Sequence, residues 1–309
     1  MDYVNRLDSF DGPKVAQIAR ENKLYEEAVV VFKKIGENVE AIQTLITFIE
    51  SLDRAAEFAE RCNTPDVWSV LGKAYLDRYL INEAVDCFIK AENPTHFMDV
   101  IEASENEEKW DILIQYLMMA KKTMKDTQVD SELLFCYAKT ENMSELEAFL
   151  ASPSSADIQQ VGDRCFQQRL FESAKVMYTK LKSNARIASC LVYLKQYPQA
   201  LEAAKKAKNT KTWKEIALAC LRAGEYKLAS VAGSNIVIHP DHLEELVKLY
   251  EKFDVAEEMV TLLEGCLTME KTHIGLFTEL GMLYAKYKPN KLMDYIRNYF
   301  HVPTYFFLP

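Results

Sequence analysis

Apolar residues recur along this chain three or four positions apart, the spacing that lines up side chains on one face of an α-helix. The pattern i, i+3, i+4, i+7 is met repeatedly, for example by Ala28/Val31/Phe32/Ile35 and Ile81/Ala84/Val85/Phe88. Each stripe is short and has polar residues on either side. The pattern therefore predicts many short amphipathic helices, each with one face to bury.

These stripes repeat with a period near thirty residues. Aligning segments similar to Leu24-Tyr25-Glu26-Glu27-Ala28 gives ten anchor positions: Ala28, Ala56, Ala84, Ile112, Leu146, Ala174, Ala200, Ala229, Met259 and Leu292. A repeat of this length has room for two short helices and two turns, so the repeating unit is predicted to be a helical hairpin. Ten such hairpins account for nearly the whole chain.

Small residues lie twelve positions before several anchors and predict close contact between the two helices of a hairpin. They are Ala16, Gly72, Gly162, Ala188 and Ala217. Aromatic residues four positions after an anchor, such as Phe88 and Tyr178, are expected to fill the space beside them. The nine prolines fall where the scheme needs turns or helix starts, which supports the segmentation independently.

The fold class predicted from this repeat is an all-α, right-handed α-α superhelix, a solenoid of about ten stacked hairpins. We expect residues 1–309 to form one continuous solenoid, with weak internal breaks near residues 126–131 and 152–157. Helix spacings of about 8–10 Å would make it a rod on the order of 100 Å long.

Composition narrows the function. Lys and Arg number 37 against 46 Asp and Glu, so the formal charge is −9, which disfavours nucleic acid or an anionic membrane as a partner. No apolar run approaches the roughly 18 residues of a membrane span, so a soluble protein is expected. The seven cysteines are widely spread without a C-x-x-C pair, which favours buried, reduced thiols.

No catalytic constellation stands out. The sequence has no phosphate-binding glycine loop, and its paired glutamates suit solvated helix faces. The segment His239-Pro240-Asp241-His242 is a weak metal-site candidate, because no further Cys or His lies close in sequence. We therefore predict no enzymatic activity, no metal and no cofactor.

Two basic clusters stand out from the acidic background as candidate partner-binding sites. The first comprises Lys208, Lys211, Trp213 and Lys214, and the second comprises Lys286, Lys288 and Lys291. One interpretation is solvated turns. The other is docking of an acidic partner helix, with Trp213 as an apolar anchor beside the lysines.

Several long strings resemble the clathrin heavy-chain family. They include Leu52-Asp53-Arg54-Ala55-Ala56-Glu57-Phe58-Ala59-Glu60-Arg61-Cys62-Asn63, Ile158-Gln159-Gln160-Val161-Gly162-Asp163-Arg164-Cys165, Thr212-Trp213-Lys214-Glu215 and Phe277-Thr278-Glu279-Leu280. The resemblance implies a leg segment of the clathrin coat, around the knee and proximal leg. It implies packing against other heavy-chain legs in the lattice and binding of clathrin light chain, most plausibly at Thr212-Trp213-Lys214-Glu215 and the lysines before it. It also implies a cytoplasmic location on coated pits and coated vesicles, with only indirect membrane contact.

The chain departs from that family in several respects. The family's adaptor-binding propeller and its trimerisation segment are not matched, so we expect neither adaptor binding nor trimerisation from this chain, and expect Met1 to be an internal start. The sequence leaves the family pattern after Pro303. Two alternatives stay open: a related solenoid of a vesicle-tethering or sorting complex, and a helical-repeat scaffold that binds peptides in a groove.

Overall fold

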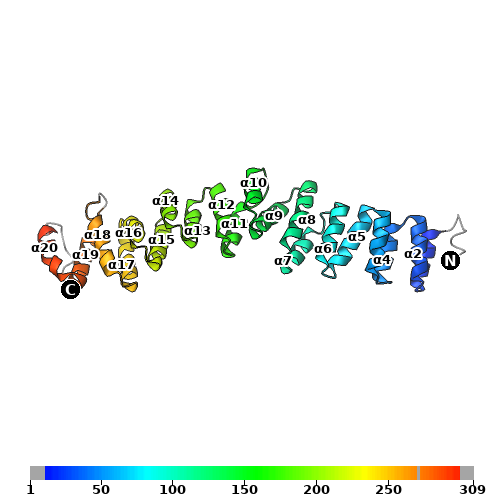
Figure 1. Ribbon diagram of the computed structural model, residues 1–309, viewed down its shortest axis with the longest axis horizontal. Coiled ribbons are helices and arrows are strands. Elements are labelled where there is room, and N and C mark those ends of the chain that lie inside the picture. The colour runs from blue at the N-terminus through cyan, green and yellow to red at the C-terminus, as the bar shows by residue number, and fades with distance from the viewer. Residues whose placement is uncertain (1–10, 270–271, 300–309) are drawn as a thin grey trace. The chain divides into compact units, whose positions relative to one another are not determined.

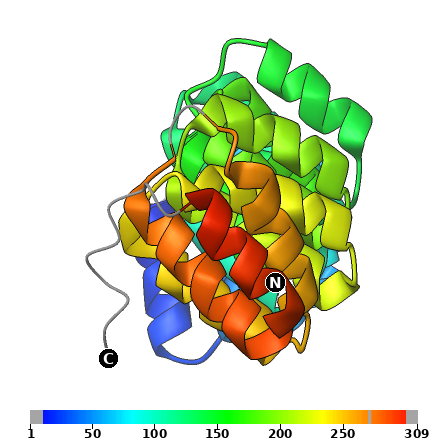
Figure 2. The same cartoon turned by 90° about the vertical axis from the view of Figure 1, so that its left-hand side faces the viewer.

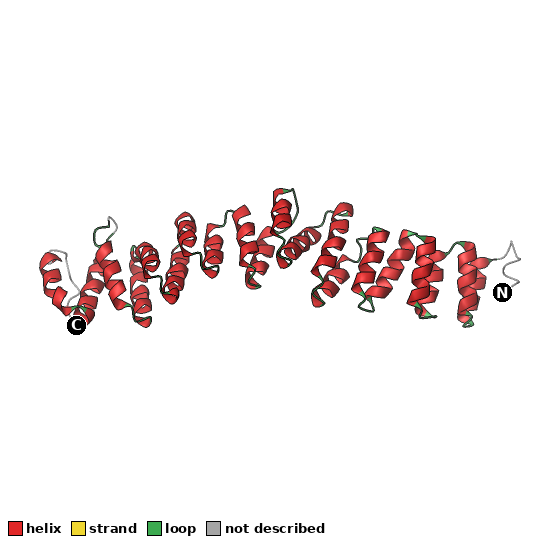
Figure 3. Ribbon diagram, viewed as in Figure 1, coloured by secondary structure: helices red, strands yellow, loops and turns green. Residues whose placement is uncertain are grey.

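The computed structural model describes residues 11–269 and 272–299. Within them every regular element is helical, as the uniformly red elements of Figure 3 show. In this described part, α-helices α1 to α20 are joined by short turns, and η1, Pro240–His242, is a 3₁₀ turn. The predicted all-α class is confirmed. The departure predicted after Pro303 lies outside the described residues.

The chain divides into two compact units, residues 1–157 and 158–309. The first holds α1 (Gly12–Glu21), α2 (Tyr25–Ile35), α3 (Asn38–Thr47), α4 (Leu52–Cys62), α5 (Pro65–Leu76), α6 (Ile81–Ala91), α7 (Phe97–Asn106), α8 (Trp110–Thr123), α9 (Thr127–Lys139) and α10 (Met143–Ala151). The second holds α11 (Ile158–Gln167), α12 (Phe171–Lys180), α13 (Asn184–Tyr193), α14 (Tyr197–Ala207), α15 (Thr210–Ala223), α16 (Tyr226–Val237), α17 (Leu243–Lys252), α18 (Ala256–Cys266), α19 (Ile274–Tyr287) and α20 (Pro289–Tyr299). The boundary between the two units lies between residues 157 and 158. The single continuous solenoid with weak breaks near residues 126–131 and 152–157 stays a prediction.

Each odd-numbered helix pairs with the even-numbered helix that follows it, and successive pairs pack on one another within each unit (Figure 1). Figure 2 shows the last pair, α19 and α20, in orange and red. All ten predicted anchors fall on even-numbered helices, which confirms the helical hairpin as the repeating unit. A hairpin of this size has too little interior to bury its own stripes, so each one depends on its neighbours.

Small residues bring the two helices of a hairpin together, as the sequence predicts. Gly72 of α5 faces Phe88 of α6, and a methyl group added to Gly72 would lie 2.9 Å from the ring of Phe88 and 3.2 Å from Cβ of Cys87. In the same way, a methyl group on Gly162 of α11 would lie 3.2 Å from the ring of Tyr178 on α12. Phe88 and Tyr178 are both fully buried. Glycine is needed here because the aromatic ring occupies the space of a Cβ atom.

The repeat alignment is one residue out of register at two anchors. Ala56 and Ile112 are only half-buried, whereas their neighbours Ala55 and Leu113 are fully buried. One residue rotates a helix position by about 100°, so a one-residue error turns the assigned anchor away from the core. In both cases an apolar residue lies directly beside the buried position, which explains why sequence spacing left the register ambiguous.

Most of the tight turns between helices use charged residues in the left-handed conformation rather than glycine. Among the described residues, Gly36 and Gly224 have positive φ, and so do Lys23, Glu50, Asn63, Tyr79, Glu92, Glu108, Glu141, Arg169, Lys182, Lys195, Lys208 and Asp254. Left-handed residues end helices because they let the following amide groups bond back to the last carbonyls. This explains how so many turns form with few glycines, and it places charged side chains at the ends of the hairpins.

The glycine at the α5–α6 contact gives a test of the packing. We expect Gly72→Ala to lower the free energy of unfolding by about 1–3 kcal/mol, because neither Phe88 nor the Cβ of Cys87 has room to move away. Gly265→Ala is the control. Gly265 is exposed in α18 with no atom within 4 Å of an added methyl group, so helix propensity alone should raise stability by about 0.5 kcal/mol. Urea unfolding followed by circular dichroism measures both, and equal effects of the two substitutions would contradict the packing argument.

Candidate partner-binding surfaces

The first basic cluster surrounds the turn between α14 and α15. Lys208 ends α14 in the left-handed conformation with φ 50°, and Asn209 begins α15 by accepting a 2.9 Å hydrogen bond from the Lys211 backbone amide. The Lys208 and Lys211 side chains are exposed, and within the described residues neither forms an ion pair. Two unpaired cations thus lie at a turn whose backbone is held by both helix ends.

Trp213, predicted as an apolar anchor beside the lysines, is buried. Its side chain is only 6% exposed and belongs to the core of the second unit together with Ile216, Ala217 and Cys220. These four residues have the i, i+3, i+4, i+7 spacing of a buried helix face, a signal already present in the sequence. The indole therefore holds α15 in the core and offers a partner no apolar surface.

Lys214, the remaining lysine of the first cluster, bridges two hairpins. Its ammonium group donates to the carboxylate of Glu245 on α17. This hydrogen bond, together with the lysine charge, lowers the pKa of the Glu245 carboxyl. Lys214 is therefore part of the contact between α15 and α17.

The second basic cluster is paired with acidic residues of the preceding hairpin. Lys286 lies 2.9 Å from Glu251, Lys288 lies 3.7 Å from Glu257 and Lys291 lies 3.0 Å from Glu264. The hydrogen bond from Lys286 lowers the pKa of the Glu251 carboxyl. These three lysines therefore connect α19 and α20 to α17 and α18, and their charge is largely balanced within the chain.

Glu264 is, like Glu251, one of the two more enclosed of these acceptors. It accepts hydrogen bonds from the Tyr284 hydroxyl at 2.5 Å and from Lys291 at 3.0 Å. Burial raises the pKa of the Glu264 carboxyl, but the two hydrogen bonds and the charges of Lys291 and Lys288 outweigh it, so the pKa is lowered. Burial and the bond to Glu264 together raise the pKa of Tyr284.

The structure keeps the two clusters apart. The first lies at the α14–α15 turn and the second at α19 and α20, with α16, α17 and α18 between them in the chain (Figure 1). They also differ in kind, since the first has unpaired cations and the second serves contacts between hairpins.

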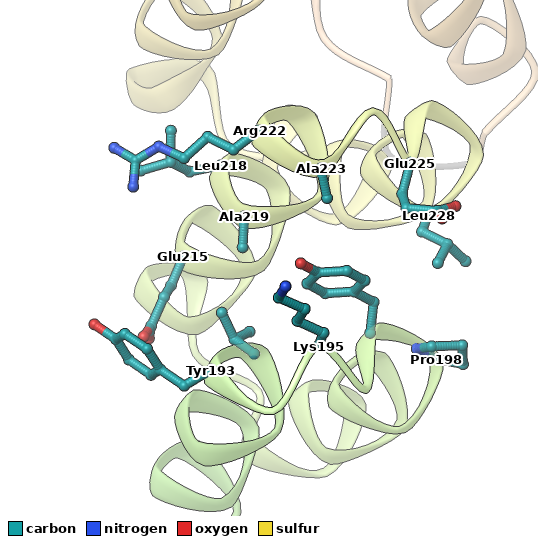
Figure 4. A pocket seen from close by; sticks show the side chains of 12 residues that line it. Tyr193, Lys195, Pro198, Glu215, Leu218, Ala219, Arg222, Ala223, Glu225 and Leu228 are labelled. Atoms are coloured by element: carbon teal, nitrogen blue, oxygen red, sulfur yellow. The ribbon is translucent and has the colours of Figure 1, made fainter. Parts of the chain in front are cut away.

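An open groove that the sequence does not predict lies between hairpins α13–α14 and α15–α16 (Figure 4). Its volume is about 940 Å³, and it is lined by Tyr193, Tyr197, Leu218, Ala219 and Leu228 among others. Tyr193 is 55% exposed and stacks on Phe171, with ring centroids 4.7 Å apart.

Charged side chains accompany this apolar lining. Lys195, Arg222 and Glu225 are exposed at the groove, and Glu215 accepts a 2.7 Å hydrogen bond from Ser189. The short side chains of Ala219 and Ala223 on one face of α15 leave the space open. These alanines are the sequence signal that could have pointed to the groove.

The described residues contain neither a cluster of metal ligands nor a reactive thiol. No group of three or more His, Cys, Asp or Glu in residues 11–269 and 272–299 could hold a metal ion, and the rings of His239 and His242 are 6.2 Å apart. None of the seven cysteines, all of which lie in the described residues, forms a disulfide, and all but the half-buried Cys62 are buried. Burial raises the pKa of the Cys87 and Cys190 thiols to about 12, which leaves them protonated and unreactive near neutral pH.

No helix in the described part of the chain combines the length and the apolar character needed to cross a membrane.

Comparison with known proteins gives a consistent match along the chain. The sequence profile of a family described as "Region in Clathrin and VPS" matches residues 1–82, 88–228 and 234–304. The clathrin heavy chain of Dictyostelium discoideum is 48% identical over 299 residues, which are 97% of this chain and 18% of that protein. The clathrin heavy chain of Drosophila melanogaster is 45% identical and human clathrin heavy chain 2 is 44% identical, each over 96% of this chain and 18% of the relative. The chain thus spans about a fifth of the length of these relatives.

The ion pairs between hairpins predict a specific response to acid. The pKa of Glu264 is lowered in the folded chain, so its contribution to stability is complete above the ordinary glutamate pKa of about 4.5 and is lost as the pH falls through the lowered value. We expect Glu264→Gln to reduce the free energy of unfolding by about 0.5–1.5 kcal/mol at pH 7, and this difference from the unsubstituted chain to narrow by pH 3.

The matched control is Glu257→Gln. Glu257 is 78% exposed and 3.7 Å from Lys288, so its replacement should change the urea midpoint little at either pH. A pH-independent effect of Glu264→Gln would contradict the role given to its charge.

Proposed function

Because this chain belongs to the family described as the region in clathrin and VPS proteins, we propose that it is a structural, non-enzymatic segment of a clathrin coat. The observation that carries the proposal is identity of 44–48% to clathrin heavy chains over nearly the whole chain, on a structure built of the helical hairpins that the repeat predicts. In this role the chain is a leg segment of coated pits and coated vesicles on the cytosolic side of the membrane. It packs there against other heavy-chain legs.

The hairpin stack suits a mechanical role. Each hairpin is stabilised by its neighbours, so bending is shared among many joints rather than concentrated in one hinge. The exposed surface carries many charged side chains, so each contact with a neighbouring leg is weak and sensitive to salt. Many weak contacts along a leg add up to a firm lattice that still comes apart stepwise.

Clathrin light chain is the second partner in this proposal, through an acidic helix that docks at the α14–α15 turn. The unpaired cations Lys208 and Lys211 support this site, and the exposed Lys206 adds positive charge beside them. Lys214 and the second cluster contribute less, because each of their lysines would first have to give up an intramolecular carboxylate. The buried Trp213 is left out of the binding surface.

Two alternatives remain for the experiments to decide. The first alternative is a subunit of a sorting complex, because the family description includes VPS proteins. The high identity to clathrin heavy chains favours a segment of the clathrin coat over this alternative. The groove beside Tyr193 favours a peptide-binding scaffold as a second candidate function. A scaffold of that kind would bind ligand through the groove independently of Lys208 and Lys211.

The first test concerns shape. If residues 1–309 form one continuous solenoid on the order of 100 Å long, small-angle X-ray scattering should give a radius of gyration near 30 Å. A compact chain of this length would have a radius of gyration of about 19 Å. A value close to the compact one would overturn the proposal of a continuous leg segment.

The second test concerns the light-chain site. We expect the double substitution Lys208→Glu and Lys211→Glu to weaken binding of purified clathrin light chain by about ten-fold or more in isothermal titration calorimetry, because it replaces attraction by repulsion. Glutamate suits the left-handed position of Lys208, since Glu92, Glu108 and Glu141 adopt it elsewhere in the chain.

The control has the same change in charge at Lys180→Glu and Lys227→Glu, two exposed lysines of α12 and α16 away from the turn. It should retain binding, and circular dichroism should show both variants folded. Equal affinities of the two double variants would remove Lys208 and Lys211 from the proposed site.

A further inference from the structure

The connection between α10 and α11, residues 152–157, is attached to α9 by side-chain hydrogen bonds. Asp130 accepts from both the backbone amide and the hydroxyl of Ser155, at 2.8 and 2.9 Å, and Ser131 accepts from the Asp157 amide at 3.0 Å. Asp130 is only 6% exposed and lies 3.4 Å from Lys121. The segment is therefore bonded to α9 through a buried carboxylate and a hydroxyl.

The helix that precedes this connection is short and packs mainly against one neighbour. α10, Met143–Ala151, is nine residues long, and α9 is its main neighbour among the described helices (Figure 1). Its contact with α9 includes the edge-to-face pair of Phe149 and Tyr137, with ring centroids 6.2 Å apart. Helices this short are marginal without strong packing or good caps, so the end of α10 is sensitive to small changes.

Ser152 closes α10 at its carboxyl end. Its backbone amide donates to the carbonyl groups of Ala148 and Phe149, each at 3.1 Å, and its hydroxyl donates to the Phe149 carbonyl at 2.8 Å. The side chain is exposed, the backbone is extended with φ −81° and ψ 154°, and Pro153 follows. Proline-directed protein kinases phosphorylate accessible serines that lie in an extended backbone immediately before a proline, as Ser152 does.

A second serine- or threonine-proline pair in the chain provides a comparison. Thr64 precedes Pro65, but it is half-buried and begins α5, so it lies at the opposite end of a helix from Ser152. Negative charge is favourable at a helix amino end and unfavourable at a carboxyl end. The two positions therefore predict opposite responses to added negative charge.

We propose that Ser152 is a phosphorylation site for a proline-directed serine/threonine kinase and that its phosphorylation loosens α10 and the attached segment 152–157. The γ-phosphoryl group of ATP is transferred to the Ser152 oxygen, ADP leaves and the hydroxyl proton is released, so the step needs no redox partner. The product has close to two negative charges at pH 7.

The consequence for α10 follows from its end geometry. The phosphoester oxygen has no proton to donate to the Phe149 carbonyl, so the 2.8 Å hydrogen bond is lost. The new charge lies beside the carbonyl groups that form the negative end of the helix. Lys121 is already paired with Asp130, and its ammonium group lies 3.7 Å from the centre of the Phe149 ring, so pairing with the phosphate would cost these contacts.

The modification itself is tested on the whole chain. Incubation with the catalytic domain of a cyclin-dependent kinase and Mg-ATP, followed by peptide mass spectrometry, should place phosphate on Ser152 at least ten-fold faster than on Thr64. The kinase is shown to be active on a standard protein substrate in parallel. Absence of phosphate at Ser152, or its appearance on Ser154 or Ser155 instead, would overturn the assignment.

The effect on α10 is tested by hydrogen–deuterium exchange. Phosphorylated chain and Ser152→Asp should both exchange amides of residues 148–157 about two- to ten-fold faster than unmodified chain, while the buried part of α8 is unchanged. Ser152→Ala removes the hydroxyl without adding charge, so it should show a smaller increase. Thr64→Asp, the matched change at a helix amino end, should leave α5 equally or better protected. Unchanged or slower exchange at residues 148–157 after phosphorylation would overturn the proposed effect.

Discussion

The close approach of two helices at a small residue is the contact on which hairpins α5–α6 and α11–α12 depend. At α5 and α6 the ring of Phe88 occupies the space that a side chain on Gly72 would need, and the same arrangement recurs between Tyr178 and Gly162. Once the two helices are this close, their remaining apolar residues face outward to the next hairpin instead of inward to a shared centre. The hairpins therefore stack on one another, because only another hairpin covers that apolar face.

Stacking leaves the hairpin ends at the surface, and the turn chemistry decides what those ends carry. Because Lys, Glu, Arg and Asp provide most of the left-handed turn residues, the turns add charged side chains to those already on the exposed faces of the helices. Charged side chains of the helices themselves also form pairs within the chain. Lys214 with Glu245, and the pairs made by Lys286 and Lys291, join hairpins that are neighbours in the stack.

The sequence predicts the repeat, the two helices of each repeating unit and the small residues at their contact, because all three depend on local spacing. The anchor register at Ala56 and Ile112 could not be predicted, since each anchor has an apolar neighbour and tertiary packing decides which of the two is buried. The candidate site was harder for a similar reason. A run of lysines shows positive charge but not the carboxylates that approach from another hairpin, and those lie 27 to 35 positions away for Lys291, Lys214 and Lys286. The burial of Trp213 could have been predicted, because its spacing to Ile216 and Cys220 already marks a buried helix face.

Charge pairing across hairpins also shapes how such a surface recognises a partner. A lysine that already holds a carboxylate must exchange one ion pair for another, so it adds specificity but little net free energy. An unpaired lysine on a well-capped turn gives its full attraction without breaking a contact, and its position is fixed before the partner arrives. Lys208 and Lys211 meet that description, whereas the larger second cluster does not. The number of basic residues in a segment is therefore a poor guide to its affinity for acidic partners; what matters is how many of them the fold has left without an acidic neighbour.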